Sequence, residues 1–456
     1  MGKLFGTDGV RGIYEQDLTL ELAYGLGQAG ASVLGRNAHR PKIVIGRDTR
    51  ESGSPLEMAL AKGILAVGGD VLLVGVLPTP AVAVITRALK ADAGVVISAS
   101  HNPYEFNGIK FFNGQGFKLA DAVENEIEEI ILQSQVVPLK DGGSIQTLEN
   151  PEVFYLNHIK KAIETDFYGL RVVLDCANGA AYNIAPALFC DLGAEVIVIG
   201  DKPDGKNINA GCGSTHLTPL QQRVVKEKAD IGIAFDGDAD RCLAVDNHGN
   251  IIDGDKIMNL IGSRMKASGR LKKDTVVVTV MSNIGLDIAL NQAGCQTIKT
   301  DVGDRYVLEA MIEGDYNLGG EQSGHLILLD HNTTGDGMLT ALVLLELLKK
   351  DGRDAKTLGD LMTVYPQILV NARVENGRKQ DYLRDDQIQK KIKEVETHFH
   401  GQGRVLIRPS GTEPLVRVMI EGKDQNELTR IAKELAQLIE ARLSDSIEAV
   451  GRPVVA

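Results

Sequence analysis

Short apolar runs alternate with longer stretches of mixed polarity, and the same arrangement occurs three times along the chain. Each copy predicts a strand, a helix, a corner of small residues and a second strand. Strands that are joined through a helix form parallel sheets covered by helices. Because the copies are widely spaced, they indicate three similar α/β domains and not a solenoid. The predicted elements are Lys42–Ile45, Pro55–Ala66 and Val71–Val74, then Arg171–Leu174, Ile184–Asp191 and Val196–Ile199, and then Thr275–Val280, Leu286–Gln292 and Gln296–Lys299.

The pattern changes after Pro366, where three strands alternate with two charged or long helices. We therefore expect an α/β protein of four domains, in which three similar α/β domains and a smaller C-terminal α+β domain surround a central cleft. The expected domains are 1–153, 154–254, 255–366 and 367–456. The strands predicted in the last domain are Ile368–Val374, Arg404–Ile407 and Leu415–Ile420, and its predicted helices are Asp386–Thr397 and Gln425–Leu443.

Composition and charge narrow the class of function. A formal net charge of −12 argues against a general binder of nucleic acid or of anionic membranes. The sequence contains no run of roughly 18 consecutive apolar residues, and its first residues lack the apolar core of a signal peptide. Its five cysteines form no Cys-x-x-Cys pair, which favours free thiols in a reducing compartment. We expect a cytoplasmic protein without nucleic-acid or membrane partners, whose local basic residues attract any anionic substrate.

A serine-containing loop follows the apolar run Val95–Ile97, which reads as a buried strand. Ser98 and Ser100 stand where this strand ends, and Pro103 prevents regular structure directly afterwards. Ligands bind at such positions in open α/β sheets. With a histidine beside it and Lys110 nearby, either serine could be a nucleophile or a phosphate carrier. A plain turn after a strand fits the same residues.

Two other loops near the N-terminus carry arginines without deciding a function. Phe5–Gly12 is punctuated by glycines and contains Arg11, and Gly46–Arg50 directly follows the predicted strand Lys42–Ile45. A surface loop explains each of them as well as a functional site does.

Three aspartates form the most specific signal in the sequence. Asp236, Asp238 and Asp240 crowd three carboxylates that would repel one another strongly without a cation. Oxygen ligands of this kind suit Mg²⁺ or Ca²⁺. An EF-hand is excluded, because Arg241 and Asn247 stand where its glycine and its bidentate glutamate belong. Since Mg²⁺ usually completes its shell with water and phosphate oxygens, the loop implies a phosphorylated partner, with a solvated acidic turn as the alternative.

Two further stretches offer dense sets of polar groups. Gly319–His325 places Glu, Gln, Ser and His between glycines, which suits the hydroxyls or an amine of a sugar. Arg408–Pro414, with Arg417 in the next predicted strand, offers the paired arginines and hydroxyls that bind a phosphate dianion. An exposed polar turn and a plain hairpin are the respective alternatives. Because each domain presents one polar loop, a shared site between domains is expected.

Four of these loops, in this order, resemble the phosphohexomutase superfamily, and the resemblance covers essentially the whole chain. The matching motifs are Ser98–Pro103, Asp236–Arg241, Gly320–His325 and Arg408–Thr412. Within the superfamily the chain is most similar to the bacterial branch that acts on glucosamine phosphates. The residues that carry this similarity are Gly6–Gly12, Val302–Tyr306 and Gln322.

The resemblance implies an isomerase that interconverts glucosamine 6-phosphate and glucosamine 1-phosphate for cell-wall precursor synthesis. It implies a phosphoserine enzyme, a glucosamine 1,6-bisphosphate intermediate, Mg²⁺ as cofactor and a homodimer. A phosphoglucomutase or phosphomannomutase is the alternative within the class. A phosphohydrolase that works through Ser100, or a sugar-phosphate binder without catalysis, is the alternative outside it.

The implied roles fall into four groups. The phosphorylated serine is Ser100, which with its phosphate would bind Mg²⁺ alongside Asp236, Asp238 and Asp240. The substrate-binding residues are Asp304, Arg305, Glu321, Ser323 and His325. The residues that hold the non-reacting phosphate are Arg408, Ser410, Gly411, Thr412 and Arg417. The residues at the reacting end are Arg11, Lys110, His101 and Arg241. Lys110 is the first candidate for the general base if nearby cations lower its pKa, and His101 and His325 follow.

Overall fold

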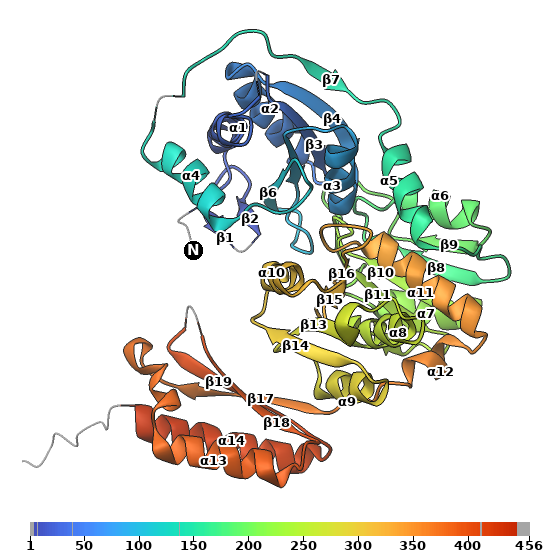
Figure 1. The fold of residues 1–456 in the computed structure, drawn as a ribbon, viewed down its shortest axis with the longest axis vertical. Coiled ribbons are helices and arrows are strands. Elements are labelled where there is room, and N and C mark those ends of the chain that lie inside the picture. The colour runs from blue at the N-terminus through green and yellow to red at the C-terminus, as the bar shows by residue number, and fades with distance from the viewer. Residues whose placement is uncertain (1–3, 7, 39, 136, 411–412, 445–456) are drawn as a thin grey trace, which may run out of the picture. The chain divides into compact units, whose positions relative to one another are not determined.

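The computed structural model describes residues 4–6, 8–38, 40–135, 137–410 and 413–444 (Figure 1). The chain forms two compact units. The first comprises Met1–Ser282 and Leu290–Met362, and the second comprises Asn283–Ala289 and Thr363–Ala456. Among the described residues, none of the helices combines the length and apolar character needed to cross a membrane.

A seven-stranded sheet in the order β1-β2-β6-β5-β3-β4-β7 organises the first part of unit one. Its central strands β4, β3 and β5 are parallel, and β6 then returns antiparallel to β5. Apolar side chains of one face of the sheet, among them Ile43, Ile45 and Val95, pack with apolar side chains of the helices into one core. The alternate positions Val44 and Val96 are buried as well, so the strands are apolar on both faces. The bounds are β1 Phe5–Gly6, β2 Gly9–Ile13, α1 Leu20–Leu34, β3 Lys42–Arg47, α2 Gly53–Ala66, β4 Asp70–Val76, α3 Thr79–Ala88, β5 Ala93–Ile97, β6 Phe106–Asn113, α4 Asp121–Leu132 and β7 Ile145–Thr147.

Helices α1 and α2 cross at a pair of glycines. A Cβ atom on Gly27 would lie 2.2 Å from the carbonyl oxygen of Leu60, and one on Gly63 would lie 2.1 Å from that of Tyr24. Since no side chain fits at such distances, these two glycines permit the close packing of the helices.

The second sheet has the order β12-β11-β10-β8-β9, and the third has the order β14-β13-β15-β16. Both have a parallel centre and one antiparallel side, as the repeated pattern predicts for α/β domains. The bounds are α5 Glu152–Ile159, β8 Arg171–Asp175, α6 Ile184–Asp191, β9 Glu195–Ile199, α7 Thr218–Glu227, β10 Ile231–Phe235, β11 Cys242–Asp246 and β12 Ile251–Ile252. They continue with α8 Gly254–Ala267, β13 Thr275–Thr279, α9 Ile284–Gln292, β14 Gln296–Thr300, α10 Asp304–Gly314, β15 Leu318–Gly320, β16 Leu326–Leu328, α11 Gly337–Asp351 and α12 Ala355–Gly359.

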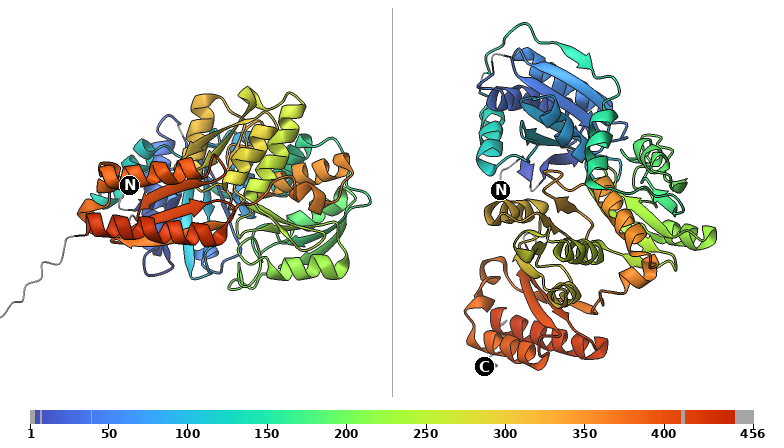
Figure 2. Two further views of the ribbon diagram at one scale, coloured as in Figure 1. Left: turned by 90° about the horizontal axis from the view of Figure 1, so that it is seen from below. Right: turned by 45° about the vertical axis from the view of Figure 1, so that its right-hand side comes forward.

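Unit two contains a three-stranded antiparallel sheet in the order β17-β19-β18, with two helices packed against it (Figures 1 and 2). Each helix begins at an aspartate, because the side chains of Asp385 and Asp424 accept hydrogen bonds from the first free N–H groups of α13 and α14. This confirms the predicted α+β fold at the end of the chain. The bounds are β17 Gln367–Arg373, α13 Asp386–His398, β18 Arg404–Pro409, β19 Leu415–Glu421 and α14 Gln425–Leu443.

Candidate active site

Ser100 lies at the carboxyl end of β5 and points at the aspartate loop. Its Oγ atom donates a hydrogen bond to Asp236 Oδ2 at 2.6 Å, and its side chain is buried. Ser98 has a different environment, since its hydroxyl donates to Asp48 Oδ2 at 2.6 Å and accepts from the Ser100 N–H at 2.9 Å. Of the two serines left open by the sequence, Ser100 is therefore the one next to the carboxylates, and Ser98 supports its loop.

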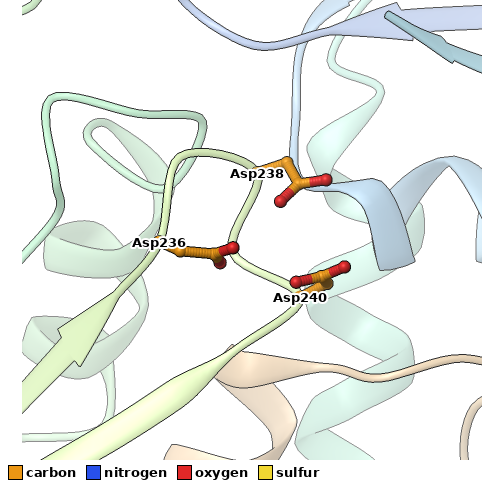
Figure 3. Close-up of side chains that lie close together, drawn as sticks. All are labelled: Asp236, Asp238 and Asp240. Carbon is orange, nitrogen blue, oxygen red and sulfur yellow. The ribbon is translucent and has the colours of Figure 1, made fainter. Parts of the chain in front are cut away.

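The three aspartates lie together on the tight connection between the antiparallel strands β10 and β11 (Figure 3). One oxygen from each of Asp236, Asp238 and Asp240 lies within 4.8 Å of the others, and all three residues are buried. Burial raises the pKa of Asp236, and the Asp240 and Asp238 carboxylates raise it further. Within the described part of the chain, one oxygen of Asp238 and one of Asp240 have no hydrogen-bond partner. These buried oxygens fit a hard divalent cation, which would satisfy them and neutralise their repulsion.

Lys110 and Thr79 approach the same aspartate from two directions. Lys110 Nζ in β6 lies 3.0 Å from Asp238 Oδ2, 2.9 Å from Asp8 Oδ2 and 3.9 Å from Asp240 Oδ2. Thr79, the first residue of α3, donates from its hydroxyl to Asp238 Oδ2 at 2.6 Å and from its N–H to the Asp238 carbonyl at 2.9 Å. The Asp238 carboxylate is thus held in place before any ligand binds.

Lys110 was the first candidate for the general base on the condition that nearby cations lower its pKa, and this condition is not met. Burial by itself lowers the pKa of Lys110, but the carboxylates of Asp238, Asp8 and Asp240 raise it above its usual value. The sequence interpretation assumed that cations surround this amine, whereas the structure surrounds it with anions. Lys110 is therefore protonated near neutral pH and supplies a positive charge.

His101 and Arg241 complete the serine side of the site. His101 Nδ1 lies 3.4 Å from Ser100 Oγ. Burial lowers the pKa of His101 to about 4, and the positive charges of Arg241 and Arg11 contribute to this shift. Arg241 Nε lies 4.0 Å from Asp236 Oδ2, at the edge of the aspartate cluster. The site thus combines a neutral imidazole with several cationic groups.

His325 joins the aspartates to a chain of alternating charges. Its Nε2 atom lies 3.8 Å from Asp240 Oδ2 and 3.5 Å from Asp304 Oδ2. Lys118 contacts the Asp304 carboxylate and lies 2.5 Å from Asp8 Oδ1. Neither ring nitrogen of the buried His325 has a hydrogen-bond partner among the residues described. Its two ring nitrogens are thus buried next to carboxylates, without a hydrogen bond from the described residues that fixes the tautomer.

Glu321, Gln322 and Ser323 of the predicted sugar loop connect β15 with the turn before β16. Glu321 Oε1 accepts a hydrogen bond from the Gly303 N–H at 3.2 Å, so the loop before α10 is tied to it. The Gln322 amide donates to Asp253 Oδ2 at 3.3 Å, and Ser323 is exposed.

Arg305 is engaged by other residues in this structure, and its predicted place in the substrate site stays a prediction. Its guanidinium contacts Asp121 and lies 3.6 Å from Glu124 and 3.0 Å from Glu309. Three carboxylates therefore engage Arg305 in an ion-pair cluster that joins α10 to α4. Asp304, the residue before it, points the other way, toward Lys118.

The sequence interpretation missed three polar side chains of the site. Asp8 belongs to a motif that was noticed only for Arg11, with which it forms an ion pair. Thr79 and Lys118 belong to no motif: Thr79 is the first residue of α3, and Lys118 lies in the connection between β6 and α4. Their importance lies in contacts to residues far away in the chain, which a local pattern does not contain.

The phosphate loop belongs to unit two, where Arg408 in β18 and Arg417 in β19 are directly opposite each other. Like charges at such a position destabilise a sheet unless an anion neutralises them. Lys379 Nζ donates to the carbonyl oxygens of Ser410 and Glu413, which shapes the two ends of the loop. The remaining predicted residues, Gly411 and Thr412, lie outside the described residues.

Domain models of a single family match successive parts of the chain. They are described as phosphoglucomutase/phosphomannomutase alpha/beta/alpha domain I at residues 2–136, domain II at 153–249, domain III at 253–367 and the C-terminal domain at 369–438. The chain belongs to the phosphoglucomutase/phosphomannomutase family. This membership confirms the resemblance that the four loops indicate.

Known members of the phosphoglucomutase/phosphomannomutase family match nearly the whole chain. Phosphoglucosamine mutase from Ruminiclostridium cellulolyticum is 58% identical over 449 residues, which cover 97% of this chain and 100% of that protein. The protein of the same name from Caldicellulosiruptor saccharolyticus is 57% identical with the same coverage.

Solved structures share the fold of this family member. A phosphoglucomutase/phosphomannomutase family protein from Burkholderia thailandensis matches with a TM-score of 0.80 at 24% identity, covering 96% of this chain and 98% of that one. Aspergillus fumigatus N-acetylphosphoglucosamine mutase, solved in complex with GlcNAc-6P and magnesium, matches with a TM-score of 0.67 at 18% identity, covering 97% and 96%.

Proposed function

We propose that this chain interconverts glucosamine 6-phosphate and glucosamine 1-phosphate, with Ser100 as the carrier of the phosphoryl group. The hydrogen bond of 2.6 Å between Ser100 Oγ and Asp236 Oδ2, beside two further buried aspartates, is the observation that carries the proposal. The substrate is inferred from the relatives named phosphoglucosamine mutase, which are 55–58% identical over nearly the whole chain. The chain is accordingly an isomerase.

The metal site of the proposal consists of Asp236, Asp238 and Asp240 together with the phosphate on Ser100. Mg²⁺ fits these residues, because Asp238 and Asp240 each offer a buried oxygen without a hydrogen-bond partner in the described structure. When bound, the ion would neutralise negative charge on the transferring phosphoryl group. The chain's own contribution is to hold three carboxylates and the serine at one point.

The transfer itself exchanges one phosphate ester for another. The P–O bond to Ser100 breaks, a P–O bond forms to the substrate hydroxyl, and the hydroxyl proton passes by way of a base to the serine oxygen that leaves. The resulting glucosamine 1,6-bisphosphate changes its orientation in the site, so that its other phosphate faces Ser100. The protonated Lys110, with Arg11 and Arg241, supplies positive charge at this end, as phosphoryl transfer requires. Because carboxylates keep Lys110 protonated, His101 and His325 fit the role of the base better.

The remaining roles follow the predicted groups. Asp304, Glu321 and Ser323 bind the amino sugar in this proposal, and Arg408, Ser410, Gly411, Thr412 and Arg417 bind the phosphate that does not react. The opposed arginines of β18 and β19 support this anion site. A homodimer that works in the cytoplasm is also part of the proposal, as the family resemblance implies.

A conversion assay tests the proposal. Purified protein is incubated with Mg²⁺, glucosamine 6-phosphate and a trace of glucosamine 1,6-bisphosphate, and the expected product is glucosamine 1-phosphate. Faster turnover of glucose 6-phosphate or mannose 6-phosphate would instead select the hexose mutases. Release of inorganic phosphate would select a phosphohydrolase, and saturable binding without phosphorylation of Ser100 would select a non-catalytic binder.

A further inference from the structure

Arg50, in the Gly46–Arg50 stretch whose function the sequence left undecided, is one of the largest fully buried side chains of the molecule. It follows β3 and is 1% exposed. Its Nε donates to Asp48 Oδ2 at 2.8 Å, and its backbone N–H donates to Asp48 Oδ1 at 3.0 Å. A buried guanidinium needs both a counter-charge and partners for its other donors.

Those partners are the backbone carbonyls of the serine loop. Nη2 donates to the carbonyl oxygens of Ser100 and Asn102, both at 2.9 Å. Nη1 donates to the carbonyl oxygen of Phe106 at 3.0 Å and to that of Pro103. A guanidinium has five N–H donors, and with Asp48 all five are engaged. Arg50 therefore has no donor left for a phosphate, unlike Arg11 or Arg241 at the same site.

The aspartate that anchors Arg50 also anchors the start of the loop. Asp48 Oδ2 accepts a hydrogen bond from Ser98 Oγ at 2.6 Å, and Ser98 Oγ in turn accepts from the Ser100 N–H at 2.9 Å. The N–H and the carbonyl of Ser100 are thus both fixed by the Asp48–Arg50 pair.

A second clamp comes from the loop between β9 and α7. The amide nitrogen of Asn209 donates to the same two carbonyl oxygens, that of Ser100 at 2.9 Å and that of Asn102 at 3.2 Å. The Asn209 N–H donates to the Ala177 carbonyl at 2.9 Å, which fixes this clamp to the sheet that carries the aspartates. The serine loop is therefore held from the β3 side and from the aspartate side at once.

These contacts act on a backbone conformation that Ser100 would not adopt freely. Its φ of +52° lies in the left-handed region, which is unfavourable for residues with a side chain. Such conformations persist only where the surroundings impose them. In this conformation the Ser100 hydroxyl is 2.6 Å from Asp236 Oδ2.

We propose that Arg50 is a positioning residue that binds four backbone carbonyl oxygens of the serine loop. It thereby holds the loop in the conformation that directs Ser100 toward the aspartates. The inference rests on the proposed phosphoryl transfer at Ser100, and it assigns to Arg50 a role separate from phosphate binding. Lysine cannot replace it, because an ammonium has three donors and lacks the planar fork.

The test compares Arg50→Lys and Asn209→Ala with Arg47→Lys, a control in the same segment whose guanidinium pairs with Glu57 at 3.3 Å. A misplacement of about 1 Å costs about 10²-fold in rate, so kcat of Arg50→Lys should fall by about 10²-fold. KM for glucosamine 6-phosphate should stay within about twofold, because Arg50 does not contact substrate. The kcat of Asn209→Ala should fall by about tenfold, since this variant removes the second clamp and leaves that of Arg50 in place. The kcat and KM of the control should match those of wild type.

Hydrogen–deuterium exchange of the peptide spanning residues 99–106 supplies a readout that needs no mutase activity. Faster exchange confined to this peptide is expected in both clamp variants and not in the control. A folded Arg50→Lys with wild-type kcat and exchange would overturn the proposal, as would a raised KM with unchanged kcat. If Arg50→Lys does not fold, Asn209→Ala decides alone by the same two readouts. If wild type fails to convert glucosamine 6-phosphate, the proposed function falls, whereas the exchange result still decides whether the clamp orders the loop.

Discussion

Ser100 and its neighbours illustrate how much of the chemistry is fixed by contacts between single side chains. The serine hydroxyl, the buried carboxylate of Asp236 and the neutral imidazole of His101 meet within hydrogen-bond distances or close to them. The protonated amine of Lys110 lies beside them and pairs with the carboxylates of Asp8 and Asp238. These contacts lead to a direct comparison of the two serines of the loop.

Replacement of Ser100 by alanine should abolish mutase activity while the fold and substrate binding persist, because only the phosphoryl acceptor is lost. Ser98→Ala is the matched control, since it removes a hydroxyl from the same loop. We expect Ser98→Ala to remain a mutase with a reduced kcat, because the Ser100 N–H loses its acceptor. It should also lose about 1–3 kcal/mol of unfolding free energy, because the buried Asp48 loses a donor. Activity assays measure the turnover of both variants, and thermal denaturation measures their loss of stability. Retained full turnover in Ser100→Ala would refute the assignment.

Local patterns could predict that the aspartates lie together, but not the ion pairs of Arg305 or the charge state of Lys110. Asp236, Asp238 and Asp240 belong to one short loop, so their spacing alone brings them together. Arg305 forms an ion pair with Asp121, whose position in α4 is visible only in the folded chain. The same holds for Asp8, which reaches Lys110 from the turn between β1 and β2.

Helix α3 carries a supporting contact of the metal loop at its first residue. Thr79→Val keeps the shape of the side chain but removes the hydroxyl that donates to Asp238. Outer contacts of this kind affect metal affinity by 10-fold to 100-fold, so we expect Mg²⁺ affinity to fall by about tenfold. Thr86→Val is the control on the same helix, because among the described residues its hydroxyl donates only to the Val82 carbonyl. Mg²⁺ titrations of activity distinguish them, and equal affinities would contradict the role of Thr79.

The contact between α4 and α10 should make stability depend on pH through Glu124. Burial raises the pKa of Glu124 to about 7 in spite of Arg305, whereas the unperturbed value is 4.5. The folded state therefore holds the proton more tightly, and this site costs stability increasingly as pH rises from about 4.5 to about 7. Glu124→Gln should have a higher Tm than wild type at pH 8, with the difference vanishing near pH 5.

The control for this prediction lies on the same helix. Glu126→Gln changes an exposed carboxylate that pairs with Arg36, and it should show no gain of Tm at pH 8. An equal gain in both variants would mean that general charge reduction, and not the burial of Glu124, causes the effect.

Strong periodicity of apolar positions made most helices and strands predictable. The buried strand β6, whose sequence contains polar residues, was not predicted. The strand β13 and the helix α14 match their predicted ranges to within one residue, because apolar positions define them on both sides. Strand β6 was not predicted, although it carries Lys110. Its sequence reads as part of the serine loop, and only its pairing with β2 and β5 makes it a strand.

The whole molecule divides its chemistry between two compact units. Unit one holds the serine, the aspartates and the histidines, and unit two holds the opposed arginines. The predicted domains 1–153, 154–254, 255–366 and 367–456, and a cleft shared by all four, stay predictions. The sequence could indicate four domains because each has its own apolar pattern, but it contains no pattern for how units are placed.

Arg408→Ala tests whether unit two anchors the substrate. A charge-assisted hydrogen bond contributes about 1.5–3 kcal/mol, so KM for both phosphosugars should rise by about 10-fold to 100-fold. Because this phosphate does not react, kcat should change far less. Arg430→Ala, an exposed arginine paired with Glu434 in the same unit, should behave as wild type. A loss of kcat at unchanged KM would contradict the anchoring role.

The most direct measurement is a single-turnover phosphoryl transfer followed by mass spectrometry. The protein is loaded with glucosamine 1,6-bisphosphate, and one portion is digested and mapped by peptide mass to locate the phosphoryl group. The rest is mixed with glucosamine 6-phosphate in the presence of Mg²⁺. We predict one phosphoryl group on Ser100, which disappears on mixing at the rate of turnover and reappears in the bisphosphate. A protein that turns over while Ser100 stays unmodified, or that carries its phosphoryl group on another residue, would contradict the account.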